Sequence, residues 1–254
     1  MHERSYNPHM ISVLMVADND ADAIRMVIRQ FQEQTYPYWE LIIVDDCSQD
    51  NSAKIIKGIA RQDSRIKFIK LKTNSGAAVA RNTAIKIASG RYIAFLDSDD
   101  LWLKDKLNLQ IEFMKKNGLS FTYGSYRLMD EFNNDMGCFI TKGEITYNSM
   151  LKTCSVGCLT AIYDVSQLGK IYMPNADKRE DYATWLKILK KIKVTKGCLE
   201  PLAIYRRHRK SVSANKIKIA FYQWRFYRDI EKLSWFKSVY YFMNYMFYGL
   251  IKYK

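Results

Sequence analysis

The chain has 254 residues, of which 48% are hydrophobic and 14% aromatic, and its formal net charge is +14. This length suits one large α/β domain, or a domain with an appendage, and the aromatic content argues against disorder. The basic excess suggests an anionic partner, such as nucleic acid, a phospholipid surface or a phosphorylated substrate.

The cysteines and histidines form no metal-binding or disulfide pattern. Five scattered cysteines include no C-x2-C pair, and the three histidines lie far apart, which argues against a structural zinc site. The polar N-terminus lacks the apolar core of a signal peptide. The longest uncharged run, residues 238–251, is too short to span a membrane. We therefore expect a cytoplasmic protein in a reducing setting.

The first half of the chain alternates apolar runs with helical patterns. Strands are expected at residues 11–17, 41–44, 66–71 and 91–96, with helices around residues 24–31, up to about residue 61, and over residues 77–88. Because most of these strands are continuous apolar runs, they predict a parallel sheet with helices on both faces. Right-handed crossovers make the fold class α/β and Rossmann-like.

The second half is less regular. Helices are expected at residues 105–116 and 179–191, and strands at 121–129, of edge or mixed-sheet type, and at 199–205. Between them, residues 130–168 are richer in polar side chains, with short β-like pieces and turns. No internal repeat or linker appears, so we expect one domain, residues 1–215, followed by a helical tail, residues 216–254.

Carboxylates cluster directly after two of the strands. Residues 41–44 are followed by Asp45 and Asp46, and residues 91–96 by the stretch DSDD, residues 97–100. The carboxyl ends of parallel strands share one edge of the sheet, where open α/β folds place ligand sites. One interpretation is a metal–diphosphate site, because clustered acids suit a hard cation. The other is that the acids cap the following helix, which accounts less well for two clusters on one edge.

Taken in order, the motifs resemble those of the family 2 glycosyltransferases of the GT-A fold, over most of residues 11–213. The most specific are Asp45-Asp46, the DSDD stretch, and Glu180-Asp181-Tyr182 with Trp185-Leu186. The further matching pieces are Asn19, Gln34-Thr35-Tyr36, Asn74-Ser75-Gly76, Ala80-Arg81-Asn82, and Tyr205-Arg206 with His208, Ser211 and Ser213. The resemblance is weaker between residues 130 and 178, where acceptor recognition usually lies in this family.

This resemblance implies an inverting, metal-dependent hexosyltransferase. The donor would be a nucleotide-diphosphate sugar, with a UDP-sugar favoured. The acceptor would be a hydroxyl of a cell-wall, capsular or teichuronic-type polysaccharide precursor, expected to be lipid-linked. A divalent metal held by carboxylates, Mn2+ or Mg2+, would offset the charge that grows on the leaving diphosphate.

The resemblance also implies roles for particular residues. Asp97 and Asp99 correspond to the D-x-D pair, with Asp99 favoured as the direct metal ligand, and His208 would join them near the diphosphate. Asp181 would be the general base. Donor binding is expected of Asp46, which would accept a hydrogen bond from the nucleobase, of Arg81, which would face the diphosphate sugar, and of Asp97, Asp100 and Arg206.

Alternatives exist for several of these residues. Glu180 and Asp181 also suit the start of a helix, where acids interact favourably with the helix dipole. Arg207, Arg209 and Lys210 are interpreted as a solvated basic loop. The sequence departs from the family at Val16-Ala17-Asp18-Asn19, where Pro-x-Tyr-Asn is usual, and this leaves the choice of nucleobase open. Cys47 and Ala84 stand where glycines are common.

The tail combines aromatic and basic residues. It contains eight Lys or Arg against two acids, and fourteen aromatic residues lie between positions 221 and 253. Such a composition favours the interface of an anionic membrane, here the inner face of the cell membrane. The alternative is a helical pair that docks on the catalytic domain or on a second subunit, and a homo-oligomer is left open.

Other functions fit the sequence less well. A nucleotide-sugar pyrophosphorylase would need a glycine-rich loop after the first strand, and a dinucleotide-binding domain would need G-x-G-x-x-G there. Neither is present. Nucleic-acid binding lacks a motif, and much of the positive charge lies in the tail. A non-catalytic nucleotide-sugar-binding homologue, or a scaffold of a polysaccharide-synthesis complex, is the runner-up.

Overall fold

The computed structural model describes residues 7–174, 176, 178–207 and 216–251. Strands and helices alternate through the first half. They are β1 (Asn7–Ala17), α1 (Ala21–Gln32), β2 (Trp39–Asp45), α2 (Ser52–Ala60), β3 (Ile66–Lys70), α3 (Ala77–Ile87) and β4 (Gly90–Asp97). β1 pairs in parallel with β2 and β4, and β2 pairs in parallel with β3. The predicted Rossmann-like half is confirmed.

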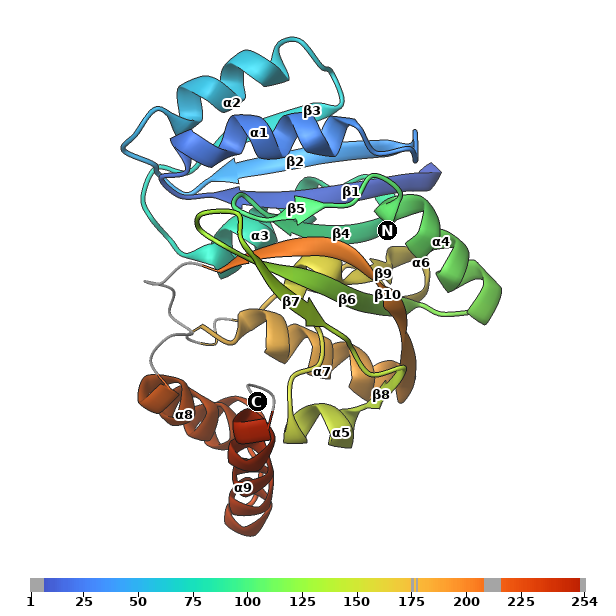
Figure 1. Ribbon diagram of the computed structural model, residues 1–254, viewed down its shortest axis with the longest axis vertical. Helices are drawn as coiled ribbons and strands as arrows, with labels where there is room; N and C mark the ends of the chain where they lie inside the picture. The colour runs from blue at the N-terminus through green and yellow to red at the C-terminus, as the bar shows by residue number, and fades with distance from the viewer. Residues whose placement is uncertain (1–6, 175, 177, 208–215, 252–254) are drawn as a thin grey trace, which may run out of the picture.

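The second half adds shorter elements to the same sheet. They are β5 (Leu101–Trp102), α4 (Lys106–Asn117), β6 (Phe121–Asp130), β7 (Asp135–Phe139), β8 (Glu144–Thr146), α5 (Tyr147–Lys152), the 3-10 turn η1 (Cys158–Thr160), β9 (Ile162–Asp164), α6 (Val165–Leu168), α7 (Glu180–Ile192) and β10 (Val194–Arg207). The strand order is β3-β2-β1-β4-β9-β6-β10-β5, with β7 on β6 and β8 on β10. Figure 1 shows these strands stacked through the middle of the molecule.

Beyond β4 the sheet is mixed. β6 and β10 run parallel, whereas β9 is antiparallel to both β4 and β6, and β5 and β8 are antiparallel to β10. β10 begins earlier than residue 199 because it continues through a register shift between Cys198 and Pro201. The mainly parallel arrangement therefore describes the half of the sheet that carries the acid clusters.

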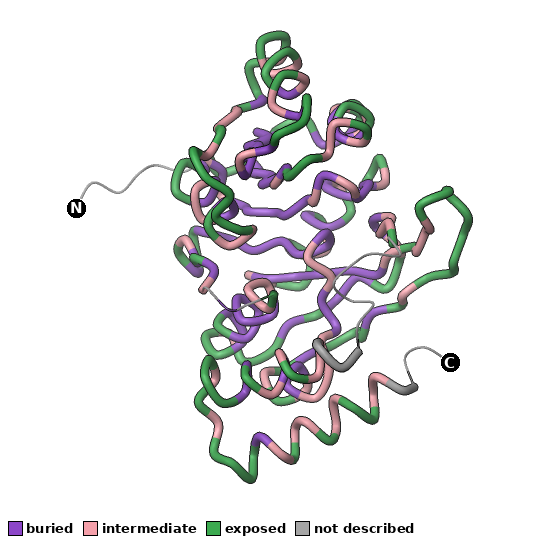
Figure 2. The backbone as a smooth tube through the Cα atoms, turned by 90° about the vertical axis from the view of Figure 1, so that its left-hand side faces the viewer, coloured by how far each residue is buried: buried purple, intermediate pink, exposed green. Residues whose placement is uncertain are grey.

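Helices cover both faces of the sheet, and each apolar strand supplies side chains to both. On β1, Val13 and Met15 pack with α1, α2 and α4 in one core cluster, whereas Leu14 packs with α3 and α7 in the other. β2 and β4 lack a polar alternation because both of their faces are covered, whereas β3, at the edge of the sheet, has exposed lysines at 67 and 70. Figure 2 shows these strands as buried stretches and the outer helices as partly exposed.

Gly90 starts β4 at a place where the backbone of β1 comes very close. A Cβ atom there would lie 2.6 Å from the carbonyl oxygen of Met10 and 2.7 Å from the nitrogen of Ser12. The Gly90 N–H donates to Ser12 Oγ at 2.8 Å. This glycine therefore lets the start of β4 approach β1 closely enough to pair with it.

The chain ends in α8 (Lys216–Arg225), a π-helical turn, η3 (Phe226–Ile230), and α9 (Trp235–Ile251). Phe226 and Tyr227 are buried in the core cluster that contains α7. Figure 1 places α8 and α9 at the end of the molecule opposite to α2. Within the described ranges, none of the helices combines the length and the apolar character needed to cross a membrane.

Candidate active site

The carboxyl end of β2 is tied to the loop before α3. Asp46 is buried, and its two carboxylate oxygens accept hydrogen bonds from the backbone N–H groups of Ser75 and Gly76, both at 2.7 Å. The preceding Asp45 is also buried, with its Oδ2 3.7 Å from Nζ of Lys70. Asp46 therefore fixes the Asn74-Ser75-Gly76 loop at the edge of the sheet.

The loop after β1 lies beside this edge. Asn19 has a positive φ of 59°, its N–H donates to Ser48 Oγ at 3.0 Å, and its Oδ1 accepts from the N–H of Gln49 at 2.9 Å. Asp18, at the position where the resemblance leads us to expect tyrosine, is exposed and accepts from Asn74 Nδ2 at 3.2 Å. The departure from the family motif thus puts a carboxylate in place of an aromatic ring.

The DSDD stretch forms a turn between β4 and β5. The Ser98 hydroxyl donates to Asp20. Asp100 is buried, and its Oδ1 accepts from the backbone N–H of Arg206 at 3.0 Å. Burial, followed by the charges of Asp99 and Asp97, raises the pKa of Asp100 well above its usual range. Asp100 thus connects the turn to the end of β10.

Arg81 of α3 joins this turn to the start of α7. Its Nη2 donates to Asp97 Oδ1 at 2.6 Å, and its Nη1 lies 3.7 Å from Glu180 Oε1. The Arg81 side chain is 9% exposed and that of Asp97 is 34% exposed. Burial lowers the pKa of Arg81, but the nearby acidic groups, first among them Asp97 with its charge and its hydrogen bond, together outweigh burial and raise the pKa, so the guanidinium remains charged.

Asp181 lies in the first turn of α7 and is half-buried. Its Oδ1 accepts from the backbone N–H of Tyr182 at 2.7 Å. Burial raises the pKa of Asp181 above its ordinary value, and the positive charge of Arg81 opposes this shift. Its position in the first turn fits the interpretation of Asp181 as an acid suited to the helix dipole, and its role as a base stays a prediction.

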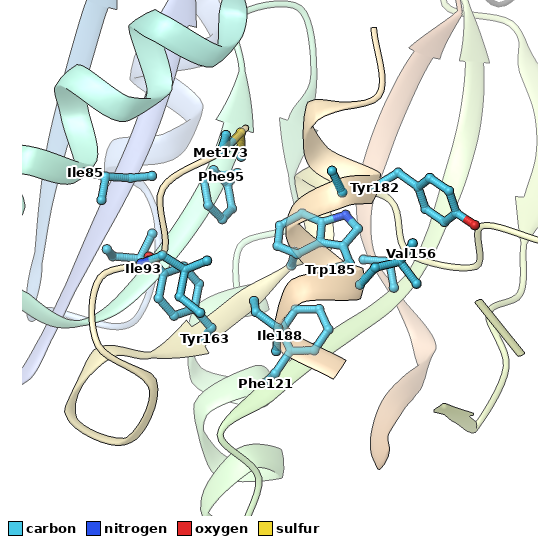
Figure 3. Packing of buried hydrophobic residues seen from close by; sticks show 14 of the residues in the cluster. Ile85, Ile93, Phe95, Phe121, Val156, Tyr163, Met173, Tyr182, Trp185 and Ile188 are labelled. Atoms are coloured by element: carbon cyan, nitrogen blue, oxygen red, sulfur yellow. The ribbon is translucent and has the colours of Figure 1, made fainter. Parts of the chain in front are cut away.

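The core beneath α7 holds this helix against the sheet. Trp185, one turn after Asp181, is buried between Phe95 of β4 and Phe121 of β6, at ring-centroid distances of 5.5 and 5.4 Å (Figure 3). Because Phe95 also belongs to the strand that ends at Asp97, one aromatic cluster supports both acidic positions. The predicted helix at residues 179–191 is therefore present as α7, and its apolar side is part of the core.

Two neighbours of the site received no binding or catalytic role from the sequence. Glu180 was noted within its motif and as an acid suited to a helix start, but it also faces Arg81. Burial raises the pKa of the Cys158 thiol in η1, while Arg81 lowers it and Asp97, Asp181 and Glu180 raise it further. Cys158 therefore lies near all of these groups. No signal in the sequence marks it, because it belongs to the stretch in which the resemblance is weak.

The structure brings most of the predicted site residues to one end of the sheet. Asp97 and Asp100 lie with Arg81 and with the backbone of Arg206, whereas His208 lies outside the described residues. Among residues that the structure describes, no group of three or more His, Cys, Asp or Glu side chains is arranged to hold a metal ion. The D-x-D pair therefore lies at the predicted edge, and its assignment as the metal ligands stays a prediction.

Comparison with known proteins gives consistent matches. Residues 12–148 match the model of the family described as Glycosyl transferase family 2. The "Putative teichuronic acid biosynthesis glycosyltransferase TuaG" of Bacillus subtilis is 44% identical over 93% of this chain and 94% of its own length. The "UDP-Glc:alpha-D-GlcNAc-diphosphoundecaprenol beta-1,3-glucosyltransferase WfgD" of Escherichia coli is 40% identical over 96% of this chain and 95% of its own length.

Solved structures agree on the fold. S. aureus TarS 1–349 in complex with UDP-GlcNAc has a TM-score of 0.69 at 20% identity, covering 93% of this chain and 71% of that chain. The mannosyltransferase PcManGT from Pyrobaculum calidifontis, in complex with GDP-Man and Mn2+, has a TM-score of 0.66 at 18% identity, covering 91% of this chain and 66% of that chain. At these identities the likeness extends to the fold alone.

Proposed function

Since this chain belongs to glycosyl transferase family 2, we propose that it transfers a sugar from a UDP-sugar to a hydroxyl of a lipid-linked saccharide during cell-surface polysaccharide synthesis. Its relatives are named glycosyltransferases, which favours catalysis over the scaffold that we considered as runner-up. The name of the E. coli relative specifies a UDP-glucose donor and a diphosphoundecaprenol-linked acceptor, and the name of the Bacillus relative specifies teichuronic acid biosynthesis. These names support the donor and acceptor classes proposed here.

The contacts of Arg81 carry this proposal. Its guanidinium bridges Asp97, at the carboxyl edge of the sheet, and Glu180, the neighbour of Asp181. The edge is where a parallel α/β sheet binds its ligand. A leaving diphosphate at the edge would therefore lie next to a buried cation, with a carboxylate base close by in the first turn of α7.

Asp181 acts as the general base in this proposal. It takes the proton from the acceptor hydroxyl as that oxygen attacks C1 of the sugar from the side opposite to the diphosphate, which inverts the configuration. A raised pKa suits this role, because a base works best when its pKa approaches the working pH. Arg81 stabilises the negative charge that develops on the departing diphosphate.

A divalent cation, Mn2+ or Mg2+, fits the acid cluster. Asp97 and Asp99 would hold it, and His208 is the further ligand that the family resemblance implies. Two carboxylates completed by substrate phosphates are a usual set for such a cation. Like-charge repulsion within the DSDD turn, which contributes to the raised pKa of Asp100, also favours a cation there. The bound ion would supply charge stabilisation to the diphosphate.

Asp46 and Asp100, which the family resemblance also assigns to donor binding, differ in whether they could contact the donor themselves. Both oxygens of Asp46 already accept backbone hydrogen bonds, so a nucleobase contact would use their remaining lone pairs. Asp100 accepts from the backbone N–H of Arg206, so we propose that it serves the donor by placing Arg206 at the edge of the sheet.

We also propose that the protein binds the cytoplasmic face of the cell membrane through α9. Large exposed side chains follow one another along one side of this helix: Phe236, Tyr240, Met243 and Phe247, spaced by three or four residues. Exposed lysines at 232 and 237 lie at its N-terminal end. An apolar face beside basic residues complements an anionic lipid surface, and such a site would bring the enzyme to a lipid-linked acceptor.

Vesicle flotation tests the membrane proposal. The Phe236→Ser/Phe247→Ser double variant of the full chain should lose binding to vesicles that contain anionic lipid. The matched control is Met26→Ser, which removes an apolar side chain that is 44% exposed on α1. If wild type and double variant float equally, this helix face is not the membrane site.

The transfer assay tests the function itself. UDP-, GDP- and dTDP-sugars are first screened by thermal shift with Mn2+, because a bound ligand raises apparent stability. Transfer is then measured with UDP-glucose, and with any other donor found, on a diphosphoundecaprenol-linked GlcNAc acceptor. We expect a UDP-sugar to stabilise the protein and a product heavier by one sugar. A donor that binds without any transfer or hydrolysis would instead favour the scaffold.

A further inference from the structure

The C-terminal helices hold α7 at both of its ends. At the start of α7, Arg179 Nη2 donates to the Tyr245 hydroxyl of α9 at 2.8 Å, and the guanidinium carbon lies 5.6 Å from the centroid of that ring. In the last turn of α7, Lys190 Nζ lies 2.7 Å from Glu231 Oε2, just after η3. The tail therefore contacts the helix that presents Asp181 at both of its ends, in addition to the core that holds its apolar side.

The residues on both sides of Asp181 take part in these contacts. Tyr182 is buried, its ring centroid lies 4.7 Å from that of Phe226 in η3, and its hydroxyl donates to the Met150 carbonyl at 2.8 Å. Arg179, two residues before Asp181, is the N-cap of α7, and its carbonyl oxygen accepts from the N–H of Ala183 at 2.9 Å. A shift of Arg179 would therefore move the first turn of the helix.

We propose that the tail is a positioning element of the active site, in which Tyr245 holds Arg179 and so fixes Asp181 relative to the acceptor hydroxyl. This inference rests on the proposed role of Asp181 as the base. Proton transfer requires the base to lie within hydrogen-bond distance of the attacking oxygen. A misplacement of about 1 Å is enough to lower turnover by about 100-fold.

Other contacts keep the tail in place independently of Tyr245. The Tyr241 hydroxyl donates to Asn148 Oδ1 at 3.0 Å, Glu231 binds Lys190, and Phe226 is buried in the core. Removal of the Tyr245 hydroxyl should therefore leave the tail docked while it breaks the hydrogen bond that holds Arg179. The effect on catalysis can in this way be separated from the effect on folding.

The first test compares Tyr245→Phe with Tyr248→Phe in the full chain. Tyr248 lies one turn further along α9, its ring faces Lys142, and its substitution removes the same hydroxyl group. With the donor and acceptor that wild type turns over, Tyr245→Phe should lower kcat by about 10-fold, because the base is less well placed. The KM for the donor and the Tm should stay near wild type. Tyr248→Phe should match wild type throughout.

A double-mutant cycle with Arg179→Gln tests whether Tyr245 acts through Arg179. If it does, the double variant should lose no more activity than Arg179→Gln alone, because the two side chains form one unit. The proposal is overturned if Tyr245→Phe keeps wild-type kcat, or if the two losses multiply. Asp181→Asn distinguishes a failure of the proposed base from a failure of the proposed positioning. If Asp181→Asn still transfers sugar, Asp181 is not the base. If Asp181→Asn is inactive but Tyr245→Phe is fully active, Asp181 can be the base and only the positioning role of Tyr245 is refuted.

Discussion

Replacing Arg81 with Gln removes the cation that links the two acidic parts of the site. The substitution keeps a polar side chain of similar length but breaks the 2.6 Å contact with Asp97 and the 3.7 Å contact with Glu180. A hydrogen bond to a charged group contributes about 1.5–3 kcal/mol to stability. Asp97 is 34% exposed, so solvent screening reduces this contribution to about 1–2 kcal/mol.

The loss in stability should be modest and the loss in catalysis large. For a chain of this size, about 1–2 kcal/mol lowers Tm by about 2–8 °C. Loss of a preorganised charge at the departing group typically costs about 100- to 1,000-fold in kcat. Thermal unfolding and steady-state transfer at saturating donor measure the two effects in the same protein samples. Arg81→Lys should recover part of the activity, since it keeps the charge but not the forked geometry.

Arg91→Gln is the matched control. Arg91 stands at the start of β4, and its Nε and Nη2 donate to Asp164 Oδ2 at 3.0 and 2.7 Å. This arginine–aspartate pair lies at the opposite end of the strand from Asp97. Arg91→Gln should therefore lower Tm by a similar amount and leave kcat near wild type. Equal kcat values for the two variants would refute the assignment of Arg81 to the diphosphate.

Three further outcomes follow from the structure. Gly90→Ala should destabilise the protein by about 3 kcal/mol, as measured by urea unfolding, because its Cβ would meet the backbone of β1; an unchanged midpoint would contradict that close approach. Asp99→Asn should raise the Mn2+ concentration for half-maximal transfer by at least about 10-fold, and an unchanged Mn2+ titration would exclude Asp99 as a ligand. The base must be deprotonated, so kcat should fall as the pH falls through the raised pKa of Asp181; an acid limb at the pH typical of an ordinary aspartate would argue against this assignment.

The sequence predicted best those elements, such as the strands of the first half, that are marked by runs of buried apolar residues. β2 and β4 are apolar along most of their length because both faces are covered, and their parallel pairing with β1 places Asp46 and Asp97 at one edge. The pattern could not predict the mixed order beyond β4, since β9 is only three residues long and pairs with distant strands.

Several site contacts join residues that are far apart in sequence. Glu180 lies next to Arg81 only because α7 packs across the sheet, and Cys158 approaches the same group from a stretch without a motif. The sequence also gave no indication that Asp100 would bind the backbone of Arg206 rather than solvent or ligand. Such pairings depend on tertiary packing, which local propensity does not encode.

The tail combines parts of the two arrangements considered from the sequence. Its inner side docks on the catalytic domain through Phe226, Tyr227 and Tyr245. Its outer side exposes Phe236 and Phe247, and the binding of this side to membranes stays a prediction. Composition alone could not separate the two sides, because aromatic residues occupy both.

Sugar transfer by the Asp181→Asn variant tests most directly the claim that Asp181 is the general base. The substitution keeps the shape of the side chain but removes its ability to take a proton. Donor affinity, measured by thermal shift with UDP-sugar and Mn2+, should remain within about twofold of wild type, and transfer to the lipid-linked acceptor should fall by at least about 1,000-fold, within the range in which loss of general base catalysis lies. A variant that binds the donor and still transfers at more than about a tenth of the wild-type rate would contradict the account.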